Sequence, residues 1–149
     1  MDKAAITAFI RQRLLEQTET CRREMNLAQE SANSEEKSSA GDKYETGRAM
    51  SQQQRDFFAV RLEEALLHLA MFDASVGREK SGTIQAGSLI KAGEQLFFVG
   101  SGLGLISLPG GEKLICTTAD SPLGRNLIGR KQGDDVLFSG KLLRITNFS

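Results

Sequence analysis

The stretch FAVRLEEALLHLAMFDASV, residues 58–76, decides the fold of this chain. Its apolar residues step alternately by four and three positions, which is the spacing of a coiled-coil seam. The seam consists of Phe58, Leu62, Ala65, Leu69, Phe72 and Val76. Charged residues such as Arg61 and Glu64 lie off it. The pattern predicts a helix over residues 43–76 that buries one narrow stripe.

A second stripe precedes the first. Residues 2–34 contain no helix breaker, and their stripe consists of Ile10, Leu14, Gln17, Cys21, Met25, Ala28 and Ala32. Neither stripe is wide enough for a helix buried on all sides, so two antiparallel helices packed stripe against stripe satisfy both. A helix of about 30 residues is about 45 Å long. We therefore expect a long hairpin whose charged tip lies near residues 35–45.

The composition changes near residue 80. Residues 1–80 contain three of the 15 glycines and no proline, whereas residues 81–149 contain the other twelve glycines and both prolines. Charged residues are dense in the first part and sparse in the second. This contrast predicts two domains, a solvated helical hairpin over 1–80 and a small β-rich domain over 81–149.

Short apolar or alternating runs bounded by glycine predict the strands of the second domain. The runs are residues 87–91, 94–100, 103–108, 113–118, 135–139 and 142–148. Pro109-Gly-Gly predicts a hairpin turn, and Ser121-Pro122 predicts the start of a short helix that stops at Gly129. The predicted fold class is α+β: an antiparallel helical hairpin, or coiled coil, followed by a small antiparallel sheet with one short helix.

The overall charge excludes several classes of function. The 149 residues contain 19 Lys and Arg and 19 Asp and Glu, so the chain lacks the basic excess of a nonspecific nucleic-acid or membrane binder. No apolar run approaches the roughly 20 residues of a membrane span. Cys21 and Cys116 form no zinc-binding pattern, and no signal peptide is evident. We expect a cytoplasmic protein with reduced thiols and no stably bound cofactor.

Two apparent motifs have simpler explanations. Gly100-Ser-Gly-Leu-Gly104 follows an apolar run, as a phosphate-binding loop does. Such a loop needs a helix directly after it, and the strand-like residues 105–108 follow instead, so a hairpin or bulge is predicted. The lone His68 has no Ser, Cys or Asp partner at a diagnostic spacing. It is predicted to be a surface residue of the second helix.

The tip segment Asp42-Lys-Tyr-Glu45 has two interpretations. Asp at the N-cap with Glu three residues later is a capping box, which by itself explains both residues. The same spacing also places two carboxylates on one side of an exposed helix start, where oxygen ligands suit Mg²⁺. Two carboxylates bind Mg²⁺ weakly, so the pair matters for chemistry only when it is delivered to a site that already holds phosphates and another metal.

Residues 121–136, Ser-Pro-Leu-Gly-Arg-Asn-Leu-Ile-Gly-Arg-Lys-Gln-Gly-Asp-Asp-Val, resemble a segment of the bacterial Gre transcript cleavage factors. That segment reads Ser-Pro-Ile-Ala-Arg, then Leu-Ile-Gly-Lys, then Gly-Asp-x-Val. Gly41-Asp-Lys-Tyr-Glu45 resembles the tip motif of the same family, Gly-Asp-Leu-x-Glu-Asn. The order of coiled coil and β domain agrees as well. The family's next residues, Asn-Ala-Glu-Tyr, differ from Thr46-Gly-Arg-Ala49 in this chain.

The resemblance implies a FKBP-like C-terminal domain that docks at the rim of the RNA polymerase secondary channel, and a coiled coil that enters the channel. It assigns Asp42 and Glu45 as tip carboxylates that hold a Mg²⁺ shared with the polymerase and assist cleavage of backtracked RNA. It assigns four residues to polymerase binding: Asp120, Ser121, Pro122 and Leu123. By itself, a protein of this kind is not an enzyme. A monomer is expected, and direct contact with the RNA 3′ end is left open.

Two alternatives remain. The altered residues 46–49 keep open a Gre-like channel binder without cleavage activity, acting as an inhibitor or regulator of RNA polymerase. A FKBP-like or coiled-coil binding module unrelated to transcription is the other alternative. It is disfavoured because the chain has no Trp and its single Tyr, Tyr44, lies at the tip, which leaves few aromatic residues to line a pocket.

Overall fold

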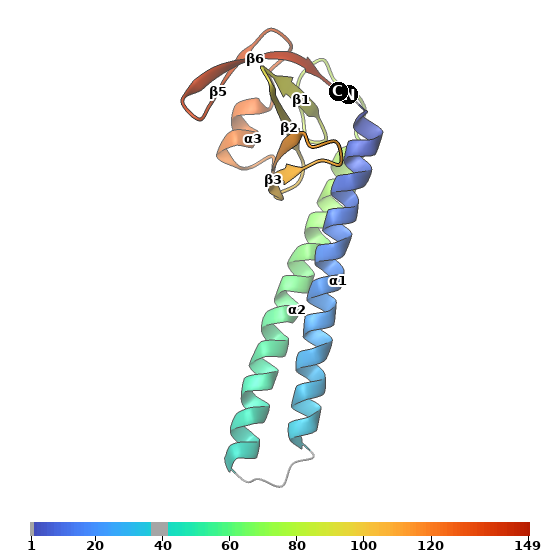
Figure 1. The fold of residues 1–149 in the computed structure, drawn as a ribbon, viewed down its shortest axis with the longest axis vertical. Helices are drawn as coiled ribbons and strands as arrows, with labels where there is room; N and C mark the ends of the chain where they lie inside the picture. The colour runs from blue at the N-terminus through green and yellow to red at the C-terminus, as the bar shows by residue number, and fades with distance from the viewer. Residues whose placement is uncertain (1, 37–41) are drawn as a thin grey trace. The chain divides into compact units, whose positions relative to one another are not determined.

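The computed structural model describes residues 2–36 and 42–149; for residues 35, 36 and 42–45 it describes the backbone alone. Two long helices come first, α1 (Lys3–Glu36) and α2 (Asp42–Val76). A sheet and a short helix follow (Figure 1). Their bounds are β1 (Leu89–Ala92), β2 (Gln95–Val99), β3 (Gly104–Ser107), β4 (Lys113–Thr117), α3 (Pro122–Leu127), β5 (Asp135–Phe138) and β6 (Lys141–Phe148). The predicted α+β fold class is confirmed.

Residues Gln12–Leu69 form a compact unit that consists of the longer parts of α1 and α2. The predicted stripe on α2 faces inward, since Ala65 is buried and its seam neighbours Leu62 and Leu69 are half-buried. On α1, Leu14 and Ala28 are buried. The two stripes therefore form the seam that the sequence predicts.

The prediction for Gln17 is wrong. Its side chain is exposed, and Thr18 is buried in its place, at 3% exposure. A step of four residues from Leu14 stays on the stripe because a helical turn takes 3.6 residues. The Thr18 hydroxyl donates to the carbonyl oxygen of Leu14 at 3.0 Å. The polar group is thus satisfied within its own helix, and a threonine can occupy the seam.

Two side-chain contacts give the register of the helices. Arg11 donates two hydrogen bonds to Asp73, at 2.9 and 3.1 Å. The hydroxyl groups of Ser31 and Ser51 lie 3.3 Å apart. Ser31 comes 20 residues after Arg11 on α1, whereas its partner Ser51 comes 22 residues before Asp73 on α2. The two helices therefore run antiparallel.

The strands form one sheet in the order β3-β4-β2-β1-β6-β5. Four of the five neighbouring pairs are antiparallel, and β2 runs parallel to β4, with Leu96 opposite Leu114. The prediction of a wholly antiparallel sheet is wrong at this pair. The predicted turn at Pro109 is confirmed: Leu108 and Glu112 bracket it and the Leu108 amide donates to the Glu112 carbonyl at 2.8 Å.

The predicted hairpin or bulge at residues 100–104 is also wrong. Strands β2 and β3 are not neighbours, because β4 lies between them. The segment 100–103 instead passes the end of β4 to connect β2 with β3. The amides of Gly100 and Ser101 both donate to the carbonyl of Thr117, at 2.8 and 3.3 Å, and this anchors the crossing segment beside the end of β4. As predicted, no helix follows the glycines.

One face of the sheet packs against α3. Its buried core contains Ile84, Ile90, Ala92, Phe97, Val99, Leu127, Val136 and Ile145. Side chains alternate between the two faces of a strand, so Phe98 points to the opposite face from Phe97. Both are fully buried, which explains why β2 reads as a continuous apolar run rather than as an alternating one.

The whole sheet, α3 and the adjoining ends of the two long helices form the second compact unit, Met1–Arg11 and Ala70–Ser149. In this unit the opposite face of the sheet meets the helix ends. The rings of Phe72 on α2 and Phe98 on β2 lie 5.7 Å apart between centroids. The helix ends thus cover the face that α3 leaves open. The predicted domain boundary at residue 80 separates the helices from the strands along the chain. The boundaries of the compact units differ from it, because the helix ends pack against the sheet.

Gly87, in the loop before β1, packs closely against the end of α2. A Cβ atom built on it would lie 2.1 Å from the backbone oxygen of Ser75, and its φ is +93°. Its amide donates to the carbonyl of Val99 at 2.6 Å. Only glycine fits both the backbone conformation and the space at this position.

Candidate functional site

The Ser121 loop, residues 118–123, joins β4 to α3 and contains the four residues predicted to bind a partner. Ser121 is the N-cap of α3, as predicted: its side-chain oxygen accepts from the amide of Gly124 at 2.9 Å. The same hydroxyl donates to the carbonyl of Thr118 at 2.9 Å and also contacts the Thr117 hydroxyl. Pro122 occupies the first helical turn, where its missing N–H costs nothing. The cap therefore fixes the shape of the loop.

Gly124 brings α3 unusually close to the Ser121 loop. A Cβ atom on Gly124 would lie 2.0 Å from the carbonyl oxygen of Thr118 and 2.9 Å from that of Ala119. The Gre segment that this stretch resembles carries alanine at the corresponding place. In this chain the loop thus packs against the first turn of α3 more tightly than any side chain at position 124 would permit.

The four predicted residues lie together in one turn, but they play different roles. Asp120 and Pro122 are exposed. Ser121 is half-buried and its hydroxyl is occupied by the cap. Leu123 is half-buried and packs against the core between α3 and the sheet. Asp120 and Pro122 are therefore available to a partner, whereas Ser121 and Leu123 hold the loop in place.

An apolar hollow of about 220 Å³ lies beside the Ser121 loop. It is lined by Met71, Ala74, Ser75, Arg78, Ala86, Gly100, Thr118 and Ala119. Met71 is 52% exposed, and Arg78 adds a positive charge at the rim. A hollow of this kind can accept an apolar side chain of a partner while Asp120 and Arg78 make polar contacts around it. The hollow was not predicted from the sequence, where the local signal for it is Met71, an apolar residue off the seam.

At the tip, the structure gives the backbone of Asp42 and Glu45 but not their side chains. Both residues lie in the first turn of α2, and residues three apart on a helix share a face. Their side chains, and so the capping box and the metal ligation, lie outside the described residues, and both interpretations stay predictions. Among the side chains that the structure describes, no group of three His, Cys, Asp or Glu could hold a metal ion.

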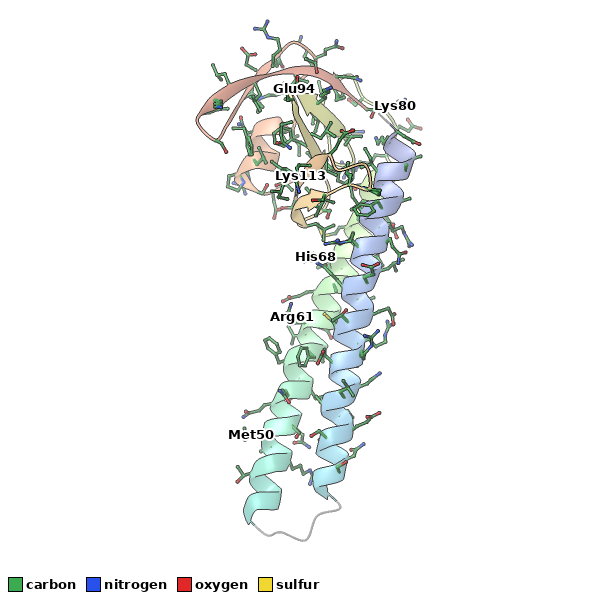
Figure 2. The ribbon with its side chains drawn as sticks, in the orientation of Figure 1. Met50, Arg61, His68, Lys80, Glu94 and Lys113 are labelled. Carbon is green, nitrogen blue, oxygen red and sulfur yellow. The ribbon has the colours of Figure 1, made fainter. Side chains whose placement is uncertain are left out.

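His68 lies on the exposed surface of α2, as predicted (Figure 2). Within residues 2–36 and 42–149, no helix has the length and apolar composition that a membrane crossing requires.

The two cysteines differ in accessibility. Cys116 lies on β4 and is buried at 3% exposure, and this burial raises the pKa of its thiol to about 12. Cys21 is half-buried on α1. Both are free thiols, which agrees with the sequence prediction of reduced cysteines. Only the thiolate form of cysteine reacts readily.

Cys21 is expected to react with a thiol reagent at pH 8 roughly a hundredfold or more faster than Cys116, because burial disfavours the thiolate. The measurement is the time course of labelling by mass spectrometry, with Cys21→Ser as the control that leaves only the slow thiol. Equal rates for the two cysteines in the folded protein would contradict the burial of β4.

Comparisons with known proteins do not assign this chain to a family. No family model, no curated protein and no solved structure matches it. The resemblance to Gre factors and to the FKBP-like fold therefore stays a prediction from the residues themselves.

Proposed function

We propose that this chain is a Gre-like factor that binds RNA polymerase at its secondary channel and stimulates the polymerase to cleave backtracked RNA. The observation that supports the proposal best is the Ser121 loop. The segment with the most specific resemblance folds into a capped turn that keeps Asp120 and Pro122 exposed. The same chain carries a long antiparallel helical hairpin with Asp42 and Glu45 in the first turn of α2.

The helical hairpin suits delivery of a charged tip into a channel. Its seam is narrow, and the surfaces outside the seam carry many charged side chains, such as Arg61 on α2 (Figure 2). The helices bury the apolar seam between them. They leave to solvent both charged side chains and apolar ones such as Phe57, Val60 and Leu67 on α2. Such a hairpin keeps its own structure without a surrounding core.

The carboxylates of Asp42 and Glu45 fit the ligand chemistry of Mg²⁺. Both offer oxygen donors, which Mg²⁺ prefers, and the two residues lie three positions apart in the first turn of α2. When shared with the polymerase, the ion would stabilise negative charge on phosphate oxygens and make a bound water more acidic. The role of the chain is to position these two carboxylates. Alone, the chain is not expected to cleave RNA.

The cell location and assembly state follow from this proposal. A partner of RNA polymerase acts in the cytoplasm of a bacterium, and one hairpin fills one channel, so a monomer is expected. No cofactor is stably bound in this account, because the Mg²⁺ is held only in the complex.

Asp120→Lys combined with Pro122→Ala is expected to weaken binding to RNA polymerase by about tenfold, since both side chains are exposed at the proposed contact. Neither contributes to the core, so the fold should persist. Substituting Leu123 would be less informative because that side chain packs against the core. The measurement is competition with an authentic Gre factor for core RNA polymerase.

The matched control for this variant is Glu94→Lys, which makes the same change of charge in the β1–β2 turn (Figure 2). The control should compete as well as the unmodified protein. If the double variant also competes as well as the unmodified protein, the Ser121 loop is not the polymerase contact.

A second candidate function is that of a Gre-like channel binder that does not stimulate cleavage. The observation that favours it is the sequence Thr46-Gly-Arg-Ala49, which replaces the Asn-Ala-Glu-Tyr of the Gre family directly after the tip carboxylates. The two candidates share the docking loop and the hairpin. They differ in one result, which is whether the unmodified protein causes RNA cleavage in a backtracked complex.

A further inference from the structure

A pocket of about 100 Å³ lies next to the apolar hollow, with which it shares Ser75, Arg78 and Ala86. In this pocket the start of α1, the segment after α2 and the loop before β1 come together. We call it the Lys3 pocket. Its lining contains Lys3, Ser75, Arg78, Glu79, Lys80, Ser81, Thr83, Gln85, Ala86, Gly87, Ser88, Phe148 and Ser149. Its volume is about three times the roughly 30 Å³ that one water occupies in the liquid. A small polyatomic ligand therefore has room in it.

Positive charge dominates this pocket. Lys3, Arg78 and Lys80 line it, against the single acidic side chain of Glu79. Within the described parts of the chain, none of these three cations forms a salt bridge. Burial and then the nearby charge of Lys80 lower the pKa of Lys3. Two ammonium groups thus lie close enough to disfavour each other, and among the described side chains no carboxylate forms a salt bridge with either.

Hydroxyl groups complete the lining. The Ser81 and Thr83 hydroxyl oxygens lie 3.4 Å apart, and the Ser88 hydroxyl oxygen accepts from the Gln85 amide at 3.0 Å. The pocket therefore combines cationic donors with neutral donors around one small space.

The walls of the Lys3 pocket are already held in place. The Gln85 side chain donates to the carbonyl of Glu79 at 2.5 Å, and the Ile84 amide donates to the carbonyl of Arg130 at 2.7 Å. Gly87 is fixed against Val99 by its amide. A ligand would meet a formed site and would not have to order the loop, which favours binding.

We propose that the Lys3 pocket binds a phosphate group with two negative charges, either free inorganic phosphate or the terminal phosphate of a nucleotide. A phosphate offers several strong acceptor oxygens and close to two negative charges, which matches three cations and several hydroxyl donors better than a monovalent carboxylate does. Lys80, which lines the pocket, lies near the start of α1 (Figure 2). This proposal does not depend on polymerase binding.

The test uses the full chain and two probes, inorganic phosphate and ATP, each titrated at constant ionic strength against sodium chloride. Backbone amide shifts in NMR spectra report where each probe binds. We expect saturable shifts, in the millimolar range or tighter, confined to residues 3, 78–88 and 148–149. The temperature of unfolding should rise with the probe, because a ligand that binds the folded state stabilises it.

Variants separate a built site from general attraction of anions. Lys80→Ala should raise the dissociation constant about tenfold, because it removes a charge-assisted contact, while Lys80→Arg should largely retain binding. Glu79→Gln should tighten it. Lys91→Ala is the matched control: Lys91 is an exposed lysine of the same domain that does not line the pocket, and its loss should leave binding unchanged.

The pKa of Lys3 in the absence of ligand tests separately whether Lys3 and Lys80 lie close together. In Lys80→Ala the pKa of Lys3, followed by NMR of its side chain, should rise toward the ordinary value because the neighbouring positive charge is gone. Tighter binding of ATP than of phosphate would assign the site to a nucleotide, and binding of phosphate alone would assign it to the free anion. Shifts equal to those of sodium chloride, or equal affinity in Lys80→Ala and Lys91→Ala, would overturn the proposal.

Discussion

Replacing Asp42 by Asn is expected to lower RNA cleavage in backtracked polymerase complexes by about a hundredfold or more, because in the proposed function this carboxylate helps to hold the Mg²⁺ that stabilises negative charge in the transition state. The same result is expected for Glu45→Gln. Asn caps a helix about as well as Asp, and Gln replaces Glu in a capping box. Each substitution therefore removes charge while it keeps the start of α2, so stability should change by only a few tenths of a kcal/mol.

The measurement is RNA gel analysis of stalled complexes at fixed Mg²⁺, alongside binding to the polymerase. Glu16→Gln is the matched control, because it converts an exposed carboxylate of α1 to an amide 20 residues before the tip end of the helix. Cleavage that survives both tip substitutions would refute the metal role of Asp42 and Glu45. An unmodified protein that binds but never causes cleavage would establish the non-cleaving regulator instead.

Gly87→Ala is expected to destabilise the sheet-containing unit by about 3 kcal/mol or more. Two costs add: a residue with a side chain at φ +93° is strained by about 1 kcal/mol, and forcing a Cβ to within 2.1 Å of the Ser75 oxygen requires α2 and the sheet to move apart. The buried contact between Phe72 and Phe98 would loosen with that movement.

Gly133→Ala measures the backbone strain without the clash of the added Cβ. Gly133 has almost the same φ, +94°, but nothing lies within 4 Å of the position of its Cβ. Its substitution should cost only about 1 kcal/mol. Urea unfolding followed by circular dichroism measures both variants. Equal losses would mean that the end of α2 does not pack against the loop before β1 as described.

The helices were predictable because their signal is local. The step of four and three from Phe58 to Val76 specifies both the element and its buried face, and Ala65 and Phe72 are buried accordingly. The error at Gln17 arises because the seven residues from Leu14 to Cys21 can be divided as three and four or as four and three, and spacing alone does not decide between Gln17 and Thr18. Thr18 fits the stripe because its hydroxyl bonds to its own backbone, a compensation that an apolar pattern does not reveal.

The order of the strands was less predictable than their positions. All six strands lie within the predicted runs or one residue beyond them, since glycines and apolar runs mark them locally. The 100–103 segment carries the chain past the position that β4 later fills, so β4 pairs with β2 in parallel. A local sequence pattern marks each strand but does not specify its neighbour in the sheet. A tight turn was the simpler expectation for a glycine-rich segment between two strands.

Some parts of the candidate site were also predictable from the sequence and others were not. The cap at Ser121 was predictable because serine followed by proline is a local helix-start signal, and the structure confirms it. The apolar hollow and the Lys3 pocket were not, because each gathers residues from three or more separate segments. The burial of Leu123 could have been suspected, since it lies four residues before the core residue Leu127 on α3.

The central claim is that this chain binds RNA polymerase with its helical tip inside the secondary channel, and site-specific photocrosslinking tests it most directly. A photoreactive phenylalanine analogue would replace Thr46, an exposed residue one position after Glu45, with the same probe at Glu94 as the control. In backtracked complexes the account predicts crosslinks from position 46 to polymerase segments around the active centre, with none of these from position 94. Absence of polymerase crosslinks from position 46, or the same crosslinks from both positions, would contradict it.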